Sequence, residues 1–381
     1  MEEFVNLLKE RLIEINEKPI RCKRCLMDET AESIVFSATG CNYCDEFIES
    51  LKNPVKKINV GINDLVNKIK QDGRNKPYDC IVGLSGGVDS SFTLLKAKEL
   101  GLRPLAVHMD NGWDSELAAN NIKNLVVNLG VDLYTHVIDW DEYRELMEAF
   151  FEADVIDIEL LYDNAMLAVD YQQANKYGLK YILAGTNTST EGFRMPKNWN
   201  WFKFDKKNIK SLGKLRNIKL NTFTAMGTFD FIYFEFIKGI KWISFLDYLE
   251  IYNKYEALEI LRRDFCYKPY PYKHYESIFT RFYQGFILPV KFGVDKRKVH
   301  LSNLILSGQI SKEDALKQLG KIPYRSEQEL VDDIAYFLKK MRWSKEKLMT
   351  YLERPERKHN EFGSEIKLYN SLKKIYLKFV K

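Results

Sequence analysis

The segment of this chain best suited to chemistry is the heptad Ser85-Gly86-Gly87-Val88-Asp89-Ser90-Ser91, which lies between an apolar run and a helical pattern. Gly86 and Gly87 allow a tight turn and let the backbone approach an anion without an intervening side chain. The helix predicted to begin near Val88 would direct free N–H groups and the positive end of its dipole at phosphate oxygens. Three hydroxyl side chains add donors: Ser85, Ser90 and Ser91. The heptad therefore predicts a phosphate-binding loop.

Asp89 is the acidic residue of this loop. A carboxylate suits an anion site only if a divalent cation lies between the two charges, so Asp89 is predicted to bind Mg²⁺. The loop lacks the lysine that ends the common Gly-Lys-Ser/Thr nucleotide loop. It resembles instead the SGGxDS loop of the ATP-pyrophosphatase superfamily. Members of that superfamily cleave ATP between its α and β phosphates and activate a carbonyl oxygen as its adenylate.

A second candidate site, residues 108–113, ends a predicted strand. Ligands of parallel α/β sheets bind beyond the carboxyl ends of strands, so Asp110 and Asn111 are predicted to contact ribose, metal or substrate. The alternative is an ordinary turn in which residues 114–116 cap the next helix. His108 alternates with apolar neighbours and is predicted to pack in the core.

A third candidate, residues 185–191, follows another predicted strand. Gly185 and Thr186 there are predicted to contact the nucleotide or a sugar, because a glycine and hydroxyl groups suit such ligands. A plain polar loop is the alternative reading of this segment.

Four cysteines form the pattern Cys22-x2-Cys25-x15-Cys41-x2-Cys44. This spacing is typical of a structural zinc site with four thiolate ligands. An iron–sulfur cluster is the alternative metal centre. Cys80 and Cys266 are the remaining cysteines, and Cys80 is predicted to be a small core residue of the first strand.

The elements around these motifs predict a doubly wound α/β fold. Apolar runs that end in glycine or polar residues alternate with helical patterns, as in a parallel sheet covered on both faces. The predicted strands are 79–85, 103–110, 132–139 and 179–185, with helices over 88–101 and 115–130. The predicted organisation is a helix and zinc module (1–60), the ATP-binding core (61–195), an aromatic-rich, substrate-specific insertion (196–265), a basic active-site segment (266–322) and a helical tail (323–381).

The charge and hydropathy of the sequence argue against a nucleic-acid partner and against a membrane span. Residues 323–381 hold 14 Lys/Arg and nine Asp/Glu, a surplus equal to the net charge of +5, so the body of the protein is neutral. A nucleic-acid partner is therefore not expected. Four charged residues interrupt the apolar stretch 229–246, which predicts a buried or substrate-facing helix rather than a membrane span. No signal sequence is recognisable at the N-terminus, so a cytoplasmic location is expected.

Several motifs together resemble the N-acetyl sugar amidotransferases, which make acetamidino sugars for bacterial lipopolysaccharide and flagellar glycans. The resemblance extends from about residue 20 to 320. It is carried by the segments 21–28, 40–44, 85–91, 107–113, 273–277, 280–285 and 291–298. It implies the PP-loop fold of adenine-nucleotide α-hydrolases, with an N-terminal zinc ribbon and a helical C-terminal part.

The resemblance also implies a reaction. ATP activates the oxygen of a sugar N-acetyl group, ammonia from a separate glutaminase subunit replaces that oxygen, and AMP and pyrophosphate are released. The sugar would be a UDP-diacetamido uronic acid or a nonulosonate. Cations must neutralise the leaving pyrophosphate, and Lys291, Lys296 and Arg297 are the predicted source. His274 and Glu276 are predicted to transfer protons when ammonia attacks.

Two alternatives share the same loop. A tRNA-modifying sulfurtransferase or a lysidine-type synthetase would use the same ATP chemistry, but it would favour a basic RNA-binding surface and often active cysteines near the loop. A non-catalytic zinc-ribbon scaffold would keep ATP binding without turnover, against which the intact Asp89 argues.

Overall fold

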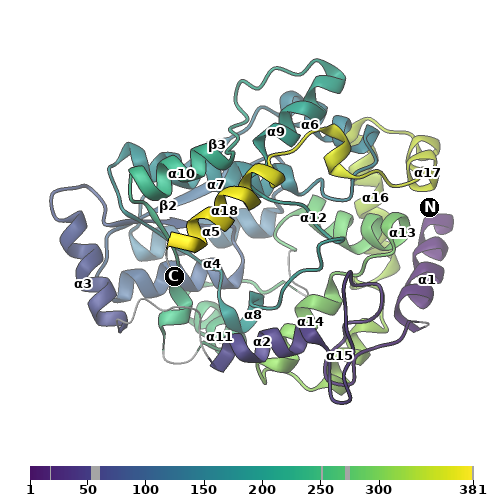
Figure 1. Ribbon diagram of the computed structural model, residues 1–381, viewed down its shortest axis with the longest axis horizontal. Coiled ribbons are helices and arrows are strands. Elements are labelled where there is room, and N and C mark those ends of the chain that lie inside the picture. The colour runs from purple at the N-terminus through teal and green to yellow at the C-terminus, as the bar shows by residue number, and fades with distance from the viewer. Residues whose placement is uncertain (18, 53–60, 250–251, 271–274, 380–381) are drawn as a thin grey trace.

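A five-stranded parallel sheet lies at the centre of the computed structural model, which describes residues 1–17, 19–52, 61–249, 252–270 and 275–379 (Figure 1). The strand order is β3-β2-β1-β4-β5, and each neighbouring pair is parallel. The strands are β1 (Cys80–Gly83), β2 (Pro104–Asp110), β3 (Leu133–Val137), β4 (Tyr181–Ala184) and β5 (Lys241–Ser244). This arrangement confirms the predicted α/β class.

Helices surround the sheet and form the remaining layers. The N-terminal pair is α1 (Glu2–Glu17) and α2 (Asn42–Lys52). Those of the sheet region are α3 (Ile62–Gly73), α4 (Val88–Glu99), α5 (Glu116–Leu129), α6 (Trp140–Glu152), α7 (Leu160–Lys176), α8 (Thr188–Glu191), α9 (Lys206–Gly213), η1 (Lys214–Arg216), α10 (Thr228–Ile232), η2 (Tyr233–Ile237), η3 (Phe245–Tyr248) and α11 (Lys254–Phe265). Those of the C-terminal part are α12 (Ile278–Phe282), η4 (Tyr283–Ile287), α13 (Leu288–Phe292), α14 (Arg297–Leu306), α15 (Lys312–Leu319), α16 (Glu327–Met341), α17 (Lys345–Glu353), η5 (His359–Phe362) and α18 (Ile366–Phe379).

Alternate residues of the central strands β1, β2 and β4 enter two separate apolar cores. Ile81 of β1 packs in the core that contains α7 and the C-terminal helices, whereas its neighbours Cys80 and Val82 pack in the core that contains α4 and α5. Successive side chains of a strand point to opposite faces, so a sheet with a core on each face needs apolar residues at every position. The continuous apolar runs in the sequence have this physical cause.

The helix boundaries around the sheet follow local capping signals. Ser115 accepts a hydrogen bond from the amide of Ala118, at 3.1 Å, and so satisfies one free donor at the start of α5. Gly130 ends the same helix in a left-handed conformation, with φ of 58°. These two residues set where α5 begins and ends.

The stretch 229–246 is not the single helix that its composition predicted. It contains α10, the π-helical turn η2 and the edge strand β5. The backbone of Lys241–Ser244 pairs with β4, so partners that are distant in sequence decided its conformation. No helix in the described ranges is both long and apolar enough to cross a membrane.

The cysteine segment and α1 pack against the C-terminal part rather than standing apart. α1 contacts α13 and α16, and α2 contacts α14 and α8 (Figure 1). Lys312 of α15 donates hydrogen bonds to the carbonyl oxygens of Cys22 and Lys23, at 3.0 and 2.6 Å. The cysteine segment is thereby attached to helices that border the candidate active site.

Candidate active site

The carboxyl ends of β1 and β4 open into a cavity of about 520 Å³. Its lining includes Ser85, Gly87, Asp89 and Ser90 of the predicted phosphate loop. The helices after residue 275 contribute the opposite wall. Parallel strands place their carboxyl ends at one edge of the sheet, and ligands of this fold class bind there.

Hydrogen bonds from two distant tyrosines and between two loop serines hold the phosphate loop in place. Gly86 has φ of 83°, a conformation that favours glycine, and its carbonyl oxygen accepts hydrogen bonds from the hydroxyls of Tyr267 and Tyr270 at 2.8 and 3.1 Å. The hydroxyls of Ser85 and Ser90 lie 3.1 Å apart. The loop is therefore in a defined conformation at the start of α4, where free N–H groups attract anions.

Gly185 allows the strand β4 to approach the loop. A Cβ atom at this position would lie 2.6 Å from the amide nitrogen of Ser90, closer than real atoms pack. Gly185 and Thr186 both line the cavity, as their predicted role requires. The third candidate segment thus lies beside the phosphate loop.

Asp89 points its carboxylate between two hydroxyl groups. Oδ2 accepts a hydrogen bond from Thr190 Oγ1 at 3.0 Å, and Oδ1 accepts one from the hydroxyl of Tyr252. Burial and the Asp89 carboxylate raise the pKa of Tyr252, so its hydroxyl keeps the proton that it donates. Glu191 lines the same cavity. Carboxylate oxygens are the ligands that Mg²⁺ prefers, and Asp89 and Glu191 both line the cavity, so their chemistry suits that ion.

His108 is buried in the core, as the sequence predicted, and hydrogen-bonds to the residue before the phosphate loop. Its Nδ1 lies 2.8 Å from the carbonyl oxygen of Leu84, and its Nε2 lies 2.9 Å from Oδ2 of Asp114. Burial opposes protonation of His108, but the Asp114 carboxylate outweighs burial and raises the pKa. A protonated imidazole donates both bonds and so ties the residue before the loop to the end of β2.

Four predicted ligand residues lie away from the cavity lining as far as the structure describes it: Gly86, Ser91, Asp110 and Asn111. Oδ1 of Asp110 accepts a hydrogen bond from the amide of Gly112 at 2.7 Å, which closes a turn. Asn111 is buried and donates to the hydroxyl of Tyr143 at 3.1 Å. Ser91 is fully buried inside the first turn of α4. The arrangement of residues 108–113 matches the turn that was the alternative reading.

Two cations of the predicted basic cluster reach the cavity, and both have carboxylate partners. Lys296 lies 2.7 Å from Oε2 of Glu159, and Arg297 lies 2.7 Å from Oδ2 of Asp295. Arg297 also donates to the carbonyl oxygen of Leu319 at 3.2 Å, at the end of α15. These partners orient both cations and reduce the positive charge that they offer to a ligand.

Lys291 does not join that cluster in the described cavity lining. Its ammonium group donates to the carbonyl oxygens of Tyr351 and Arg354 at 2.6 and 2.7 Å and lies 3.0 Å from Oδ1 of Asp154. These contacts secure the end of α17 against α13. The predicted catalytic role of Lys291 remains a prediction. Its ammonium group lies at the end of α17, outside the described cavity lining, and this location does not favour that role.

The proposed proton-transfer residues cannot be compared as a pair, because His274 lies outside the described residues. Glu276 lines the cavity beside the phosphate loop, and its Oε1 would be 3.5 Å from a Cβ atom at Gly87. Arg281 lines the same wall and pairs with Asp333, with 2.6 Å between Nε and Oδ2. The segment that begins at residue 275 and the phosphate loop therefore line the same cavity.

Sequence reasoning missed several groups in or beside this cavity. Tyr252 approaches Asp89 from a segment 163 residues further along the chain. Asp163 and Asp170 of α7 also line the cavity, although the helix pattern alone did not distinguish them. Asp170 could have been noticed in the sequence, because it is an acidic residue between Val169 and Tyr171 in a helix where most neighbours are buried.

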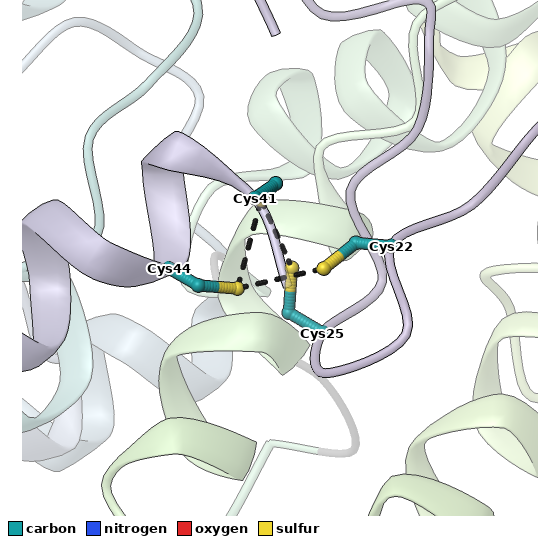
Figure 2. A group of neighbouring side chains, drawn as sticks. All are labelled: Cys22, Cys25, Cys41 and Cys44. Carbon is teal, nitrogen blue, oxygen red and sulfur yellow. Dashed lines mark hydrogen bonds between the residues drawn. The ribbon is translucent and has the colours of Figure 1, made fainter. Parts of the chain in front are cut away.

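The four predicted metal ligands converge at one point (Figure 2). The Sγ–Sγ distances are 3.6 Å for Cys22–Cys44, 4.0 Å for Cys25–Cys41 and 3.6 Å for Cys41–Cys44. A tetrahedral zinc with Zn–S bonds of about 2.3 Å requires sulfur atoms about 3.8 Å apart. All four side chains are buried. The donor set and spacing therefore fit a structural zinc ion.

Backbone amides support the same cysteine cluster. The amide of Arg24 donates to Cys22 Sγ and that of Met27 to Cys25 Sγ, each at 3.4 Å. Such bonds stabilise thiolate charge around a metal. All four thiolates point at one centre, which favours a structural over a catalytic site.

Comparison with known protein families agrees with this geometry. Residues 56–194 match the family model of NAD synthase, and residues 276–376 match the model described as LPS biosynthesis protein WbpG-like, C-terminal domain. None of the curated protein sequences matches the chain.

Similar solved structures share low identity with the chain. The NH3-dependent NAD synthetase from Campylobacter jejuni is 16% identical over 70% of this chain and 98% of its own, with a TM-score of 0.29. The glutamine-dependent NAD+ synthetase from Acinetobacter baumannii is 14% identical over 80% of this chain and 47% of its own, with a TM-score of 0.30. A predicted tRNA methyltransferase subunit from Methanocaldococcus jannaschii is 18% identical over 48% and 75%, with a TM-score of 0.28.

The fold and the two family matches define a protein with an NAD synthase-like ATP-pyrophosphatase domain. It carries in addition a WbpG-like C-terminal domain. Together they confirm the resemblance to the N-acetyl sugar amidotransferases that the motifs indicated.

Proposed function

We propose that this chain is an ATP-dependent amidotransferase that converts the N-acetyl group of a bacterial surface-glycan sugar precursor into an acetamidino group. One observation supports this most directly. The phosphate loop of the NAD synthase-like range and residues Glu276, Arg281 and Lys296 of the WbpG-like range line the same cavity. A nucleotide on the loop would meet its acceptor there.

The proposed reaction has two steps. The amide oxygen of the sugar attacks the α-phosphorus of ATP, and pyrophosphate leaves. Ammonia then adds to the carbon of the adenylated amide, AMP leaves, and the product is a protonated amidine. Adenylation is needed because an amide carbonyl is a poor electrophile with a poor leaving group. The sugar would be a UDP-diacetamido uronic acid or a nonulosonate.

The residues of the cavity have distinct tasks in this scheme. The amides at the start of α4 would bind the phosphates of ATP, and Asp89 with Glu191 would hold Mg²⁺, which supplies charge neutralisation when bound. Glu276 lies where it could accept a proton near the loop. Lys296 would face the acceptor or the leaving group across the cavity.

The products of turnover test this proposal. Purified protein with ATP, Mg²⁺, ammonium and a candidate sugar should release AMP and pyrophosphate in equal amounts and give a product with the mass of the amidine. The Asp89→Asn variant should lose this activity while its melting temperature stays close to that of the wild type. Asp64→Asn, an exposed change on α3, is the matched control. ADP and phosphate as products would refute the mechanism.

We also propose that a separate glutaminase subunit supplies the ammonia. Glutamine hydrolysis needs an activated thiolate. Cys80 is buried at the amino end of β1, remote from the loop end of that strand, and burial raises the pKa of its thiol. Cys266 is exposed at the end of α11. Ammonium should support turnover by the isolated chain, whereas glutamine should require the partner. Glutamate release by the isolated chain that Cys266→Ala or Cys80→Ala abolishes would contradict this.

A further inference from the structure

Helix α7 presents one stripe of side chains to the cavity. Asp163, Met166 and Asp170 are spaced three and four residues apart, so they lie on one face of the helix, and all three line the cavity. The two carboxyl groups of this stripe differ in their surroundings. Asp163 has a cationic partner, with 2.8 Å between its Oδ2 and Nζ of Lys203.

Asp170 has no such partner in the described part of the chain. The residue is 1% exposed, and both of its carboxyl oxygens are buried without a hydrogen-bond donor. Burying an unpaired carboxylate is costly, and burial raises the pKa of Asp170 well above its ordinary value. Buried polar groups are normally hydrogen-bonded, so a ligand that occupies this cavity is expected to donate hydrogen bonds to the two carboxyl oxygens of Asp170.

The position of Asp170 indicates which ligand that would be. A Cβ atom on Gly83 would lie 2.7 Å from Oδ2 of Asp170. Gly83 ends β1, two residues before Ser85 of the phosphate loop. The carboxyl group therefore lies at the carboxyl end of β1, beside the residues that lead into the phosphate loop.

We propose that Asp170 binds an ammonium ion and accepts one of its protons, which delivers ammonia to the adenylated amide. This inference rests on the proposed function and adds the site of its nitrogen substrate. An ammonium ion has four N–H donors and a positive charge, so it compensates a buried carboxylate better than a neutral amino or hydroxyl group does. Its small size suits a side chain that is almost closed to solvent.

The proton and bond changes balance. The ionised Asp170 takes one proton from ammonium, which leaves a neutral carboxylic acid and ammonia. The lone pair of ammonia forms the C–N bond, the C–O bond to AMP breaks, and the product leaves as a protonated amidine. The protonated acid then loses its proton to solvent before the next cycle.

The partial reactions of the Asp170→Asn variant test this site. With ATP, Mg²⁺ and acceptor sugar but no ammonium, exchange of labelled pyrophosphate into ATP should match that of the wild type. In the full reaction the KM for ammonium should rise at least about tenfold, a loss of about 1.4 kcal/mol, while the KM for ATP stays unchanged. Gln172→Ala, an exposed position on the same helix, is the matched control.

Two further readouts separate a binding role from a structural one. The rate of Asp170→Asn should follow the concentration of free ammonia and so rise more steeply with pH than the wild-type rate. Its melting temperature should rise, because the variant no longer buries an acid. Gly83→Ala places a methyl group against the carboxyl group of Asp170 and should raise the KM for ammonium in the same way. This variant provides the test if Asp170→Asn does not fold.

An unchanged KM for ammonium, or an equal increase in the KM for ATP, would overturn the ammonium site, the latter by assigning Asp170 to the nucleotide. Absence of AMP and pyrophosphate formation by the wild type would instead contradict the proposed function.

Discussion

Lys298 of α14 and Asp28 of the cysteine segment form an ion pair in which Nζ lies 2.5 Å from Oδ2 and both side chains are fully buried. Lys298 also donates to the carbonyl oxygen of Ile15 at 2.6 Å, at the end of α1. The pair thus links the N-terminal segment to the helix that begins with Arg297 and carries His300 into the cavity. The metal centre and the active site share this helix as a support.

Removing the cation should destabilise the protein strongly. Lys298→Met leaves the Asp28 carboxylate buried without its charge partner, and such a change costs about 3–5 kcal/mol of unfolding free energy. Denaturant unfolding measures this loss. The double variant Lys298→Met, Asp28→Asn should recover part of it. Lys317→Met, which breaks an exposed pair with Glu313, should leave the unfolding free energy nearly unchanged, because solvent screens that pair.

Metal analysis should find close to one zinc per chain in protein purified without added metal. Cys41→Ser should lower the zinc content and the melting temperature, because structural zinc contributes folding free energy. Cys266→Ser, which changes an exposed cysteine outside the cluster, should retain zinc. Iron and sulfide in a brown protein would show that the cluster holds a different centre.

Gly185→Ala should impair both ATP use and stability. The added Cβ would meet the amide of Ser90 at 2.6 Å and displace the start of α4 from β4. Overpacking of this kind costs about 1–3 kcal/mol, and a comparable loss in the transition state would lower kcat/KM for ATP about tenfold or more. Gly320→Ala, where the nearest atom would be 3.5 Å away, is the control. Unchanged kcat/KM in Gly185→Ala would show that the loop adapts.

Acid should destabilise the fold through His359. Its Nε2 accepts a hydrogen bond from the amide of Asp157 at 3.1 Å, and burial lowers its pKa from 6.5 to about 4. The unfolded chain binds this proton more readily, so stability falls as pH decreases from 6.5 to about 4, by about 3 kcal/mol in total. His359→Gln should flatten the pH dependence of unfolding free energy between pH 7 and 5. An equal slope in both proteins would assign the effect to other groups.

Motifs made of neighbouring residues could be interpreted from the sequence, because the interactions that shape them involve residues close together in the chain. A glycine turn between a buried strand and the start of a helix predicts an anion site, and the paired cysteines predict a metal site, without knowledge of distant residues. The sheet was predictable for the same reason, because the apolar runs of β1, β2 and β4 and the less buried strand β3 alternate with helical patterns. β5 was not predicted, since a short edge strand depends on its partner for its conformation.

Tertiary packing decided which of the candidate residues share a cavity. Lys291 and Lys296 are five residues apart, yet only Lys296 faces the cavity in the described structure, because α13 turns Lys291 toward the end of α17. Tyr252 meets Asp89, and Asp170 lies over Gly83, through contacts between distant segments. Sequence spacing specifies which face of a helix a side chain occupies, but only the packing of whole elements determines what that face meets.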